Sequence, residues 1–420
     1  MDVSLLLPIM VTCVGLYLMI RLRFFFVLHP VRTAGEFLSS ASDRGARRSL
    51  FLALAGTLGV GNIFGVAAGI MIGGAGSLFW LFISSLFAMV IKYAETLLVF
   101  SEDIDRGGTS ALLSRVFRRA GRILSPLYAA FMLLLSLFMG CAMQTAAVID
   151  VSVSSLSLHP AVSLFILIIL LLPAILGGAR KIESITEIII PLTTLIYIIC
   201  CFFAIFANLS RLPAAINGIL SSAFNIKSAA GGCIGFLAVR EGFARGILSN
   251  EAGVGSSAMA HSRSREREPH GAGLFAMCEV VFDSMLLCML TGLAILVTVP
   301  DISTCRTPMS LVSVAFSSVL GGLSDIILPI LILAFAYATL ICWYFYGREC
   351  ADIYFPRVSS AFPLIFVLFA FASGFLTSDF LLYVIDVLLT LMSIMTLSAI
   401  IKKTPDIVNI HRDRKRKNPD

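Results

Sequence analysis

The segment Gly56-Thr57-Leu58-Gly59-Val60-Gly61-Asn62-Ile63-Phe64-Gly65 interrupts a long apolar stretch of the 420-residue chain. It holds four glycines, and each costs about 1 kcal/mol in a helix interior relative to alanine. A second segment, Arg245-Gly246-Ile247-Leu248-Ser249-Asn250-Glu251-Ala252-Gly253-Val254-Gly255, combines glycines with two charged residues. Both segments therefore predict membrane helices that are discontinuous near their middles.

The composition places these segments in a membrane protein. The chain is 58% hydrophobic and only 13% charged, with a mean hydropathy of +0.97. A soluble domain carries about 25% charged residues. Charges this sparse cannot cover the surface of a water-soluble particle, which excludes a cytosolic enzyme, a disordered protein and a nucleic-acid-binding module. The sequence predicts an all-α, multi-pass integral membrane protein.

Eleven stretches are long enough to cross a bilayer, for which a helix needs about 20 apolar residues. Residues 1–20 lack a basic segment before the apolar run, so the first stretch predicts a retained helix and not a cleaved signal. Ten stretches are mostly apolar, and the eleventh, at 229–260, is rich in glycine and interrupted by charge. The predicted spans are 4–20, 50–72, 77–100, 123–149, 161–177, 186–207, 229–260, 273–299, 326–346, 360–377 and 380–401.

The distribution of basic residues sets the orientation. With the N-terminus outside and the C-terminus in the cytoplasm, the inward loops and the tail hold 25 of the 31 Lys and Arg residues. The outward loops hold only Arg211, Lys227 and Arg306. Cytoplasmic loops carry an excess of basic residues, so this asymmetry supports eleven crossings. The predicted location is the plasma membrane, the inner (cytoplasmic) membrane of a cell.

The two interrupted spans occupy matching positions. When the first helix is set aside, ten spans divide into halves of five that run in opposite directions, and helices 2 and 7 head the two halves. Discontinuous helices at matching positions of inverted repeats indicate the binding site of a secondary transporter. The alternative, glycines that only permit close helix packing, is weaker for two such helices than for one. The predicted parts are 1–49 (N-terminal helix and interfacial segment), 50–207 and 229–401 (the repeats), and 402–420 (basic cytoplasmic tail).

Charged residues within the spans are the remaining candidates for function, since charge inside a membrane is costly. Lys92 and Glu95, three residues apart on one helix, favour a snorkelling or structural pair. Glu279 and Asp283 are one turn apart, and carboxyl groups that close suggest that one holds a proton. The charges expected to serve as gating or structural charges are Arg240, Glu241, Arg245, Glu251, Asp283 and Asp386. The first four would pair locally or form an inner gate, and each of the last two would pair with a basic group, cap a discontinuous helix or carry a proton. The ten Cys and five His form no metal-binding pattern.

The chain resembles the alanine/glycine:cation symporter family, the sodium:alanine symporters, among the LeuT-like transporters of the APC superfamily. The resemblance runs from Gly15 to Asp386, and the stretch around Ser249-Asn250-Glu251-Ala252-Gly253 is its most specific part. The matching stretches are Gly59–Val66, Gly73–Trp80, Lys92–Glu95, Arg245–His261, Phe282–Ser284 and Cys342–Gly347.

The resemblance implies Na⁺-coupled symport of a small neutral amino acid, typically alanine or glycine, by alternating access. It implies substrate contacts at Gly59, Gly61, Asn62, Gln144, Leu248, Ser249, Asn250, Thr339 and Trp343, with Trp343 and Leu248 limiting the volume. It places the cation near Leu58, Asn62 and Thr339. No cofactor, no catalytic residue and no metal other than Na⁺ is implied. The expected partners are the amino acid and the lipid bilayer, without nucleic acid, and a monomer is compatible with the sequence.

Several positions depart from the family pattern and keep other functions open. Val60 stands where the family usually has Thr, and Ala338 precedes Thr339 where a hydroxyl pair is usual. Because Na⁺ prefers oxygen ligands, a proton-coupled carrier, a carrier of altered specificity and a non-transporting amino-acid sensor remain alternatives. A channel is disfavoured, since no filter loops repeat. An intramembrane enzyme is disfavoured by the absence of zinc, nucleophile-elbow and P-loop motifs.

Overall fold

The computed structural model of the protein describes residues 3–40, 44–224, 234–262, 268–373, 376 and 378–417. These residues are helical apart from short connections, and no β-strand occurs among them. The start of the predicted seventh span, residues 229–233, lies outside this described part. The all-α prediction is confirmed.

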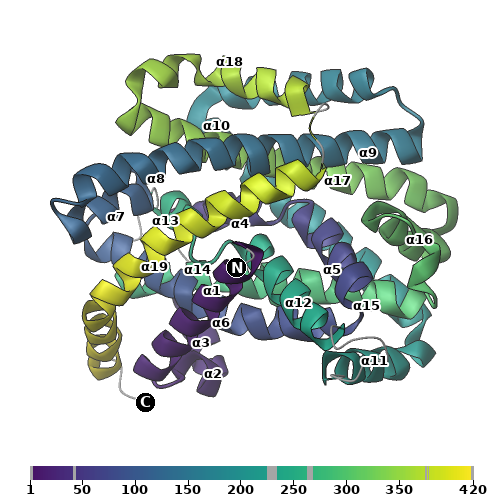
Figure 1. The fold of residues 1–420 in the computed structure, drawn as a ribbon, viewed down its shortest axis with the longest axis horizontal. Coiled ribbons are helices and arrows are strands. Elements are labelled where there is room, and N and C mark those ends of the chain that lie inside the picture. Colours follow the sequence, from purple (N-terminus) through teal and green to yellow (C-terminus); the bar gives the residue numbers. More distant parts are fainter. Residues whose placement is uncertain are drawn as a thin grey trace.

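Figure 1 labels the helices and colours them in chain order, from purple at the N-terminus to yellow at the C-terminus. The first half comprises α1 (Val3–Arg21), α2 (Phe25–Leu28), α3 (Pro30–Ser40), α4 (Arg44–Thr57), η1 (Gly61–Gly65), α5 (Val66–Gly73), α6 (Gly76–Ser101), α7 (Gly108–Phe117), α8 (Gly121–Leu135), η2 (Ser136–Met143), α9 (Gln144–Leu156) and α10 (Pro160–Ala207). The second half comprises η3 (Leu209–Arg211), α11 (Leu212–Phe224), α12 (Ile234–Asn250), α13 (Ser256–His261), α14 (Pro269–Val280), η4 (Val281–Cys288), α15 (Met289–Thr298), η5 (Ile302–Thr304), α16 (Pro308–Leu320), η6 (Gly321–Leu323), α17 (Ser324–Tyr354), α18 (Pro356–Ala372) and α19 (Ser378–Lys417).

Six helices in the described residues are long and apolar enough to cross a membrane, and the bent pair α4–α5 makes a seventh. Shorter apolar helices cover Leu6–Arg21 and Pro356–Ala372. The predicted spans 161–177 and 186–207 both lie in α10, where Gly178 leaves the helical conformation (φ 66°, ψ −169°). The α10 element therefore consists of two helices joined by a kink at Gly178, and each contains one of the predicted crossings. The count of eleven crossings and the inverted repeat stay predictions.

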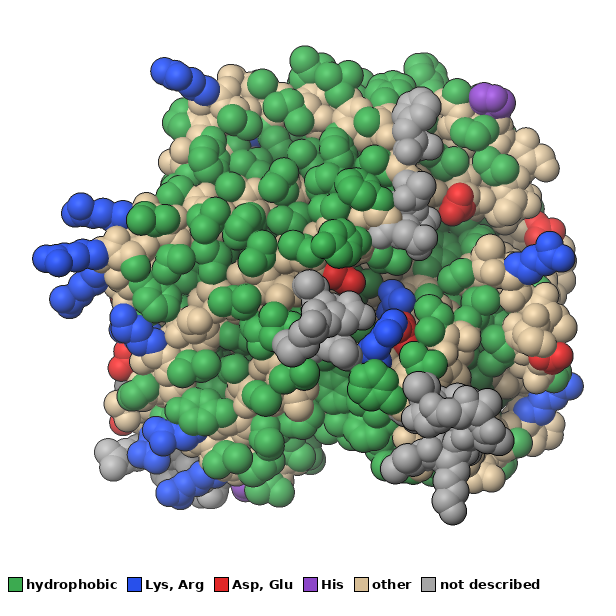
Figure 2. Space-filling model, viewed as in Figure 1, with side chains coloured by type: hydrophobic (Ala, Val, Ile, Leu, Met, Phe, Trp, Pro, Cys, Tyr) green, Lys and Arg blue, Asp and Glu red, His purple; other side chains and the backbone are tan. Residues whose placement is uncertain are grey.

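Burial separates inner helices from outer ones. The apolar windows of α6 and α17 are 67% and 72% buried, whereas that of α10 is 28% buried. Large apolar side chains on α10, among them Phe165, Leu176 and Phe206, are exposed. In Figure 2, hydrophobic side chains cover the middle of the visible face, and basic side chains gather along its left edge. An exposed apolar surface of this extent is what a lipid bilayer covers.

The discontinuous helices lie in the middle of the molecule (Figure 1). The α12 helix packs against α6 and α5, and α4 packs against α10 and α17. Three connections that the sequence left as loops contain further helices, α7, α11 and α16. The last begins with a reciprocal cap, in which Thr307 and Ser310 each bond the other's backbone N–H at 3.1 Å.

Candidate functional site

The first break falls within the glycine-rich segment, as predicted. The α4 helix ends at Thr57, the next helical segment begins at Gly61, and their axes differ by 51°. A Cβ atom on Gly59 would lie 2.9 Å from Thr339 Oγ1 and 3.1 Å from Gln144 Oε1. Only a glycine therefore allows Thr339 and Gln144 to approach the backbone at this point.

Most backbone N–H groups at the first break have partners, but one carbonyl does not. The Val60 N–H donates to Gln144 Oε1 over a long 3.3 Å. The Leu58 carbonyl accepts no hydrogen bond from the described part of the chain. An unpaired buried carbonyl costs free energy that a bound ligand can recover. The first break can therefore bind a cation or a polar ligand group.

The second break lies between α12, which ends at Asn250, and α13, which begins at Ser256. Its turns are left-handed at Glu251 (φ 55°), Gly253 (φ 89°) and Gly255 (φ 89°). Glycine adopts this conformation without strain, but a glutamate in it costs about 1 kcal/mol or more. Such strain persists where surrounding contacts enforce it, commonly at functional sites.

Side chains from other helices satisfy the carbonyls of the second break. The Tyr128 hydroxyl donates to the Val254 carbonyl at 2.6 Å, and Thr109 Oγ1 donates to the Gly255 carbonyl at 3.0 Å. Within the break, the Ala252 N–H donates to Asn250 Oδ1 at 3.1 Å. The protein thus holds the second break in place by itself, which contrasts with the open carbonyl at Leu58.

Buried oxygen atoms from three elements meet between the breaks. The Asn62 amide donates to Asp283 Oδ1, and Ser249 Oγ donates to Asp283 Oδ2 at 2.6 Å. Ser284 Oγ lies 2.8 Å from the same carboxylate oxygen and accepts from the Asn250 amide at 3.2 Å. One carboxylate, one amide oxygen and two hydroxyls form a set of ligands that suits a hard monovalent cation.

Three π-helical segments supply residues next to the breaks. The η1 segment contains Asn62, η4 contains Asp283 and Ser284, and Gln144 directly follows η2. A π-helical turn widens a helix and changes the direction of its side chains, and such turns occur frequently at functional sites. No pattern in the sequence indicated them.

A cavity of about 540 Å³ ends at the two discontinuous helices. Its lining includes Val60, Gly61 and Leu248 beside the two breaks. It is also lined by side chains of segments that the charge distribution assigns to the outside, including Asp150, Ser154, Thr307, Pro308 and Met309. Figure 2 shows basic and acidic side chains within a hollow on this face.

Ion pairs at the cavity involve three of the predicted gate residues. Arg245 Nη2 lies 3.0 Å from Glu241 Oε2, and Arg240 Nη2 lies 3.1 Å from Glu241 Oε1. Arg245 also lines the cavity, as do Asp150 and Thr307. A role as an inner gate stays a prediction for this group of paired charges. Glu251 takes no part in it and bonds the Ser256 hydroxyl.

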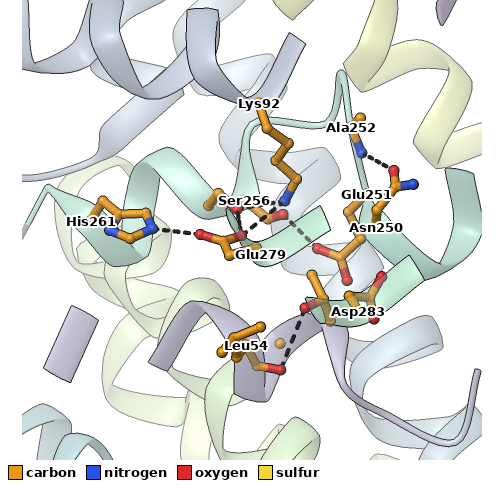
Figure 3. A network of polar contacts seen from close by, with 12 residues as sticks. Leu54, Lys92, Asn250, Glu251, Ala252, Ser256, His261, Glu279 and Asp283 are labelled. Atoms are coloured by element: carbon orange, nitrogen blue, oxygen red, sulfur yellow. Dashed lines mark hydrogen bonds and ion pairs between the residues drawn. The ribbon is translucent and has the colours of Figure 1, made fainter. Parts of the chain in front are cut away.

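A second charged cluster is buried beside the second break (Figure 3). Lys92 Nζ lies 3.4 Å from Glu279 Oε2, and Ser257 and His261 also bond this carboxylate. The predicted snorkelling pair of Lys92 with Glu95 is wrong, since Lys92 is fully buried and its ion pair is with Glu279. His261 also lies 3.2 Å from Ser49 Oγ on α4, so the cluster joins both discontinuous helices.

The buried acids outnumber the buried bases. Both oxygens of Glu95 and one of Glu251 lack a hydrogen-bond partner in the described residues, and both side chains are within electrostatic reach of Lys92. Figure 3 shows the Glu251 carboxylate between the Lys92–Glu279 pair and Asp283. Four carboxyl groups face Lys92 and His261, so full ionisation would leave excess negative charge in the membrane interior. Such charge is stable only with bound protons or cations.

The structure separates the predicted substrate residues into groups. Gly61 and Leu248 line the cavity, Gly59 meets Gln144 and Thr339, and Asn62, Ser249 and Asn250 belong to the oxygen cluster. Trp343 is fully buried, donates its indole N–H to the Gly56 carbonyl at 3.2 Å, and is not in the cavity lining. That Trp343 limits the volume for the substrate stays a prediction. Asp386 is half-buried on α19.

Sequence reasoning missed several residues that build the site. Ser284 follows Asp283 directly, and its role could have been inferred from that position. Tyr128 and His261 gave no signal, because their partners Val254 and Glu279 are set by the tertiary structure. No three His, Cys, Asp or Glu side chains converge as metal ligands in the part of the chain that the structure describes.

An all-helical membrane fold with a cavity that ends at two helix breaks defines a secondary transporter. Its fold is similar to that of a mutant manganese transporter from Eremococcus coleocola, with a TM-score of 0.55 and 16% identity over 84% of this chain and 76% of that one. The model of the sodium:alanine symporter family matches residues 2–419. The chain belongs to the sodium:alanine symporter family.

Two relatives illustrate this membership. The chain is 31% identical to the sodium/alanine symporter AgcS of Methanococcus maripaludis, over 80% of this chain and 78% of that protein. It is 29% identical to an uncharacterized transporter of Haemophilus influenzae, over 97% of this chain and 92% of that protein. The resemblance inferred from the glycine-rich segment and from the stretch Ser249–Gly253 is thereby confirmed.

Proposed function

We propose that the protein carries a small neutral amino acid, such as alanine or glycine, across the cytoplasmic membrane together with Na⁺, by alternating access. The observation that carries this proposal is the cavity that ends at Val60, Gly61 and Leu248, between the two discontinuous helices. Membership of the sodium:alanine symporter family and the relative named as a sodium/alanine symporter support it.

The amino acid would bind at the floor of the cavity. The helical run Gly61–Gly73 begins there, so its positive dipole end would face an incoming carboxylate. The N–H groups of Asn62, Ile63 and Phe64 already bond carbonyls of Gly59 and Val60, so the dipole and the Gly61 backbone would provide the attraction. Val60, Phe64 and Leu248 form an apolar wall around this point. An apolar wall suits a short aliphatic side chain and disfavours a charged one.

The sodium ion would bind at the oxygen cluster of Asp283, Asn62 and Ser249. This cluster provides a carboxylate beside amide and hydroxyl oxygens, and the open Leu58 carbonyl is nearby in sequence on the same discontinuous helix. Asn62 and Ser249 each come from a different discontinuous helix, so a bound cation would draw the two helices together. That coupling would link ion binding to the geometry of the cavity.

The transport cycle would exchange an outward-open state for an inward-open one. In the predicted orientation the cavity opens outward, and the cluster of Lys92, Glu279 and His261 closes the inner side by joining α4, α6, α13 and α14. Inward opening would require this cluster to separate or to move as a unit.

A proton-coupled carrier is the second candidate function, favoured by the excess of buried carboxyl groups around Lys92 and His261. Radiolabelled alanine and glycine uptake into proteoliposomes separates the two. Uptake that requires an inward Na⁺ gradient supports the sodium symporter, and uptake that follows only a proton gradient supports the alternative. Measurable binding without uptake under either gradient would contradict both and favour a sensor.

A matched pair of variants locates the coupling ion. We expect Asp283→Asn to abolish uptake driven by the Na⁺ gradient, because the carboxylate charge is lost. Asp325→Asn, at an exposed residue of α17, should transport as the unaltered protein does. Full Na⁺-driven uptake by Asp283→Asn would refute the placement of the ion while leaving the class of transporter unaffected.

A further inference from the structure

A basic cavity of about 420 Å³ lies where α1 ends, on the side of the membrane that carries most of the basic residues. Arg21, Arg23 and His29 line it from the N-terminal segment, and His411 and Arg412 line it from the end of α19. Phe25 contributes an apolar surface, and no acidic side chain is present in the lining. Figure 1 shows α2 and the end of α19 on the same lower left part of the molecule.

The three arginines have no ion-pair partners among the described residues. Arg21 has only a distant contact with the ring of Tyr17, at 6.0 Å from the centroid. Some arginines elsewhere in the described structure are paired, as Arg106 is with Glu349 at 3.0 Å. Three unpaired guanidinium groups around one concave surface repel one another, and an anion would relieve that repulsion.

The backbone that places two of these arginines is strained. Arg23 (φ 57°) and Phe24 (φ 53°) are consecutive non-glycine residues in the left-handed region. The Phe24 N–H bonds the Met19 carbonyl at 2.7 Å, which ends α1 with the closure that usually has glycine at the turn. The chain accepts a cost of about 1 kcal/mol at each residue, and the turn brings Arg21 and Arg23 to the same cavity.

Exposed apolar side chains directly precede or follow the lining residues in sequence. Ile20, Val27 and Leu28 are 56%, 42% and 66% exposed. The cavity also lies at the end of the apolar helix Leu6–Arg21. A basic recess bordered by exposed apolar side chains at a helix end matches a lipid, whose phosphate lies at the interface and whose acyl chains lie in the hydrocarbon.

We infer that this cavity binds the headgroup of an anionic phospholipid of the cytoplasmic leaflet, with the phosphodiester held by Arg21, Arg23 and Arg412. A guanidinium offers two parallel N–H groups to a phosphate, which an ammonium cannot do. The lipid would connect the N-terminal segment to the last helix. This site does not depend on which solute the transporter carries.

Native mass spectrometry of the full-length protein with phosphatidylglycerol and phosphatidylcholine tests this site. The unaltered protein should retain one phosphatidylglycerol more than the variant Arg21→Gln/Arg23→Gln/Arg412→Gln. Each basic residue at a membrane surface contributes about a fivefold change in binding, so the triple variant should bind phosphatidylglycerol about 100-fold more weakly. Arg118→Gln/Arg119→Gln/Arg122→Gln removes three exposed arginines elsewhere, and it should behave as the unaltered protein does.

Two further measurements keep the test decisive. Replacement of the same three arginines by lysine keeps the charge but not the paired N–H geometry, so it should restore only part of the preference for phosphatidylglycerol. Inorganic phosphate and glycerol phosphate, added at millimolar concentration in detergent, should not displace the lipid. Equal lipid retention by both triple glutamine variants would overturn the inference, and displacement by inorganic phosphate would show a site for a free anion.

Discussion

Lys92 and Glu279 form an ion pair inside the molecule, with Nζ 3.4 Å from Oε2 and the two side chains 0% and 1% exposed. The residues lie on α6 and α14, and Ser257 and His261 of α13 bond the same carboxylate. A charge pair that water cannot reach depends on both partners. It therefore fixes α13, the segment after the second break, against two neighbouring helices.

Removal of one partner should destabilise the protein strongly. Lys92→Met or Glu279→Gln alone leaves an uncompensated polar group or charge in the interior, with an expected loss of about 3–5 kcal/mol. The double variant Lys92→Met/Glu279→Gln should recover a large part of that loss. Thermal denaturation in detergent measures both effects. Lys403→Met, which removes partly exposed pairs with Glu102 and Asp406, should cost less than about 1 kcal/mol. Additive effects of the two single variants at Lys92 and Glu279 would contradict the buried pair.

Gly59→Ala should abolish transport, because the added methyl group would lie 2.9 Å from Thr339 Oγ1 and 3.1 Å from Gln144 Oε1. Gly218→Ala, on α11 outside the proposed site, is the matched control, since a Cβ on Gly218 meets no atom within 4 Å. Uptake and size-exclusion profiles of the two variants make the comparison. The double variant Gly59→Ala/Thr339→Ala should regain part of the activity, and unchanged uptake by Gly59→Ala alone would show that the close approach is unimportant.

Tyr128→Phe should loosen the second break, because the hydroxyl donates to the Val254 carbonyl at 2.6 Å. Loss of a buried donor costs about 1–3 kcal/mol when its acceptor is left unpaired. Thr396 Oγ1 is a second, weaker donor to this carbonyl at 3.3 Å. Thr396→Val alone should therefore destabilise the second break less than Tyr128→Phe does. In the Tyr128→Phe background it should destabilise the break more, because the carbonyl then loses its last donor. Hydrogen exchange at residues 251–255 reports the effect, and equal costs in both backgrounds would argue against a shared carbonyl.

The cavity should be accessible from outside the cell. Ala146 lines the cavity, whereas Ser114 on α7 is exposed on the side of the basic residues. In a background without Cys13, the exposed cysteine of the described residues, Ala146→Cys should react with a membrane-impermeant thiol reagent added outside. Alanine with Na⁺ should protect it, and Ser114→Cys should react only from the cytoplasmic side. The reverse pattern would invert the predicted orientation.

Local chemistry explains which features the sequence predicted. Glycines at 56, 59, 61 and 65 and the Asn250–Gly255 segment indicated both breaks, because a glycine-rich helix is weak whatever surrounds it. The partner of Lys92 was predicted wrongly, since Glu95 is near in sequence but Glu279 is the residue that α14 brings to it. The packing of Trp343 could not be predicted for a similar reason: Gly140 leaves space for its side chain, since a Cβ on Gly140 would lie 2.1 Å from Trp343 Cβ. Loop helices such as α7 and α16 depend on tertiary packing and gave no clear apolar period.

The central claim is that Asn62, Ser249 and Asp283 bind the ion that couples to the amino acid. Its most direct test is the Na⁺ dependence of radiolabelled alanine binding to the purified protein and to Asp283→Asn, Ser249→Ala and Asp325→Asn. We expect alanine affinity to rise with Na⁺ for the unaltered protein and for Asp325→Asn. Ser249→Ala should need at least about tenfold more Na⁺ to reach the same alanine affinity, because a hydrogen bond to a charged group is lost. The alanine affinity of Asp283→Asn should not depend on Na⁺. Unchanged Na⁺ dependence in Asp283→Asn would contradict the account.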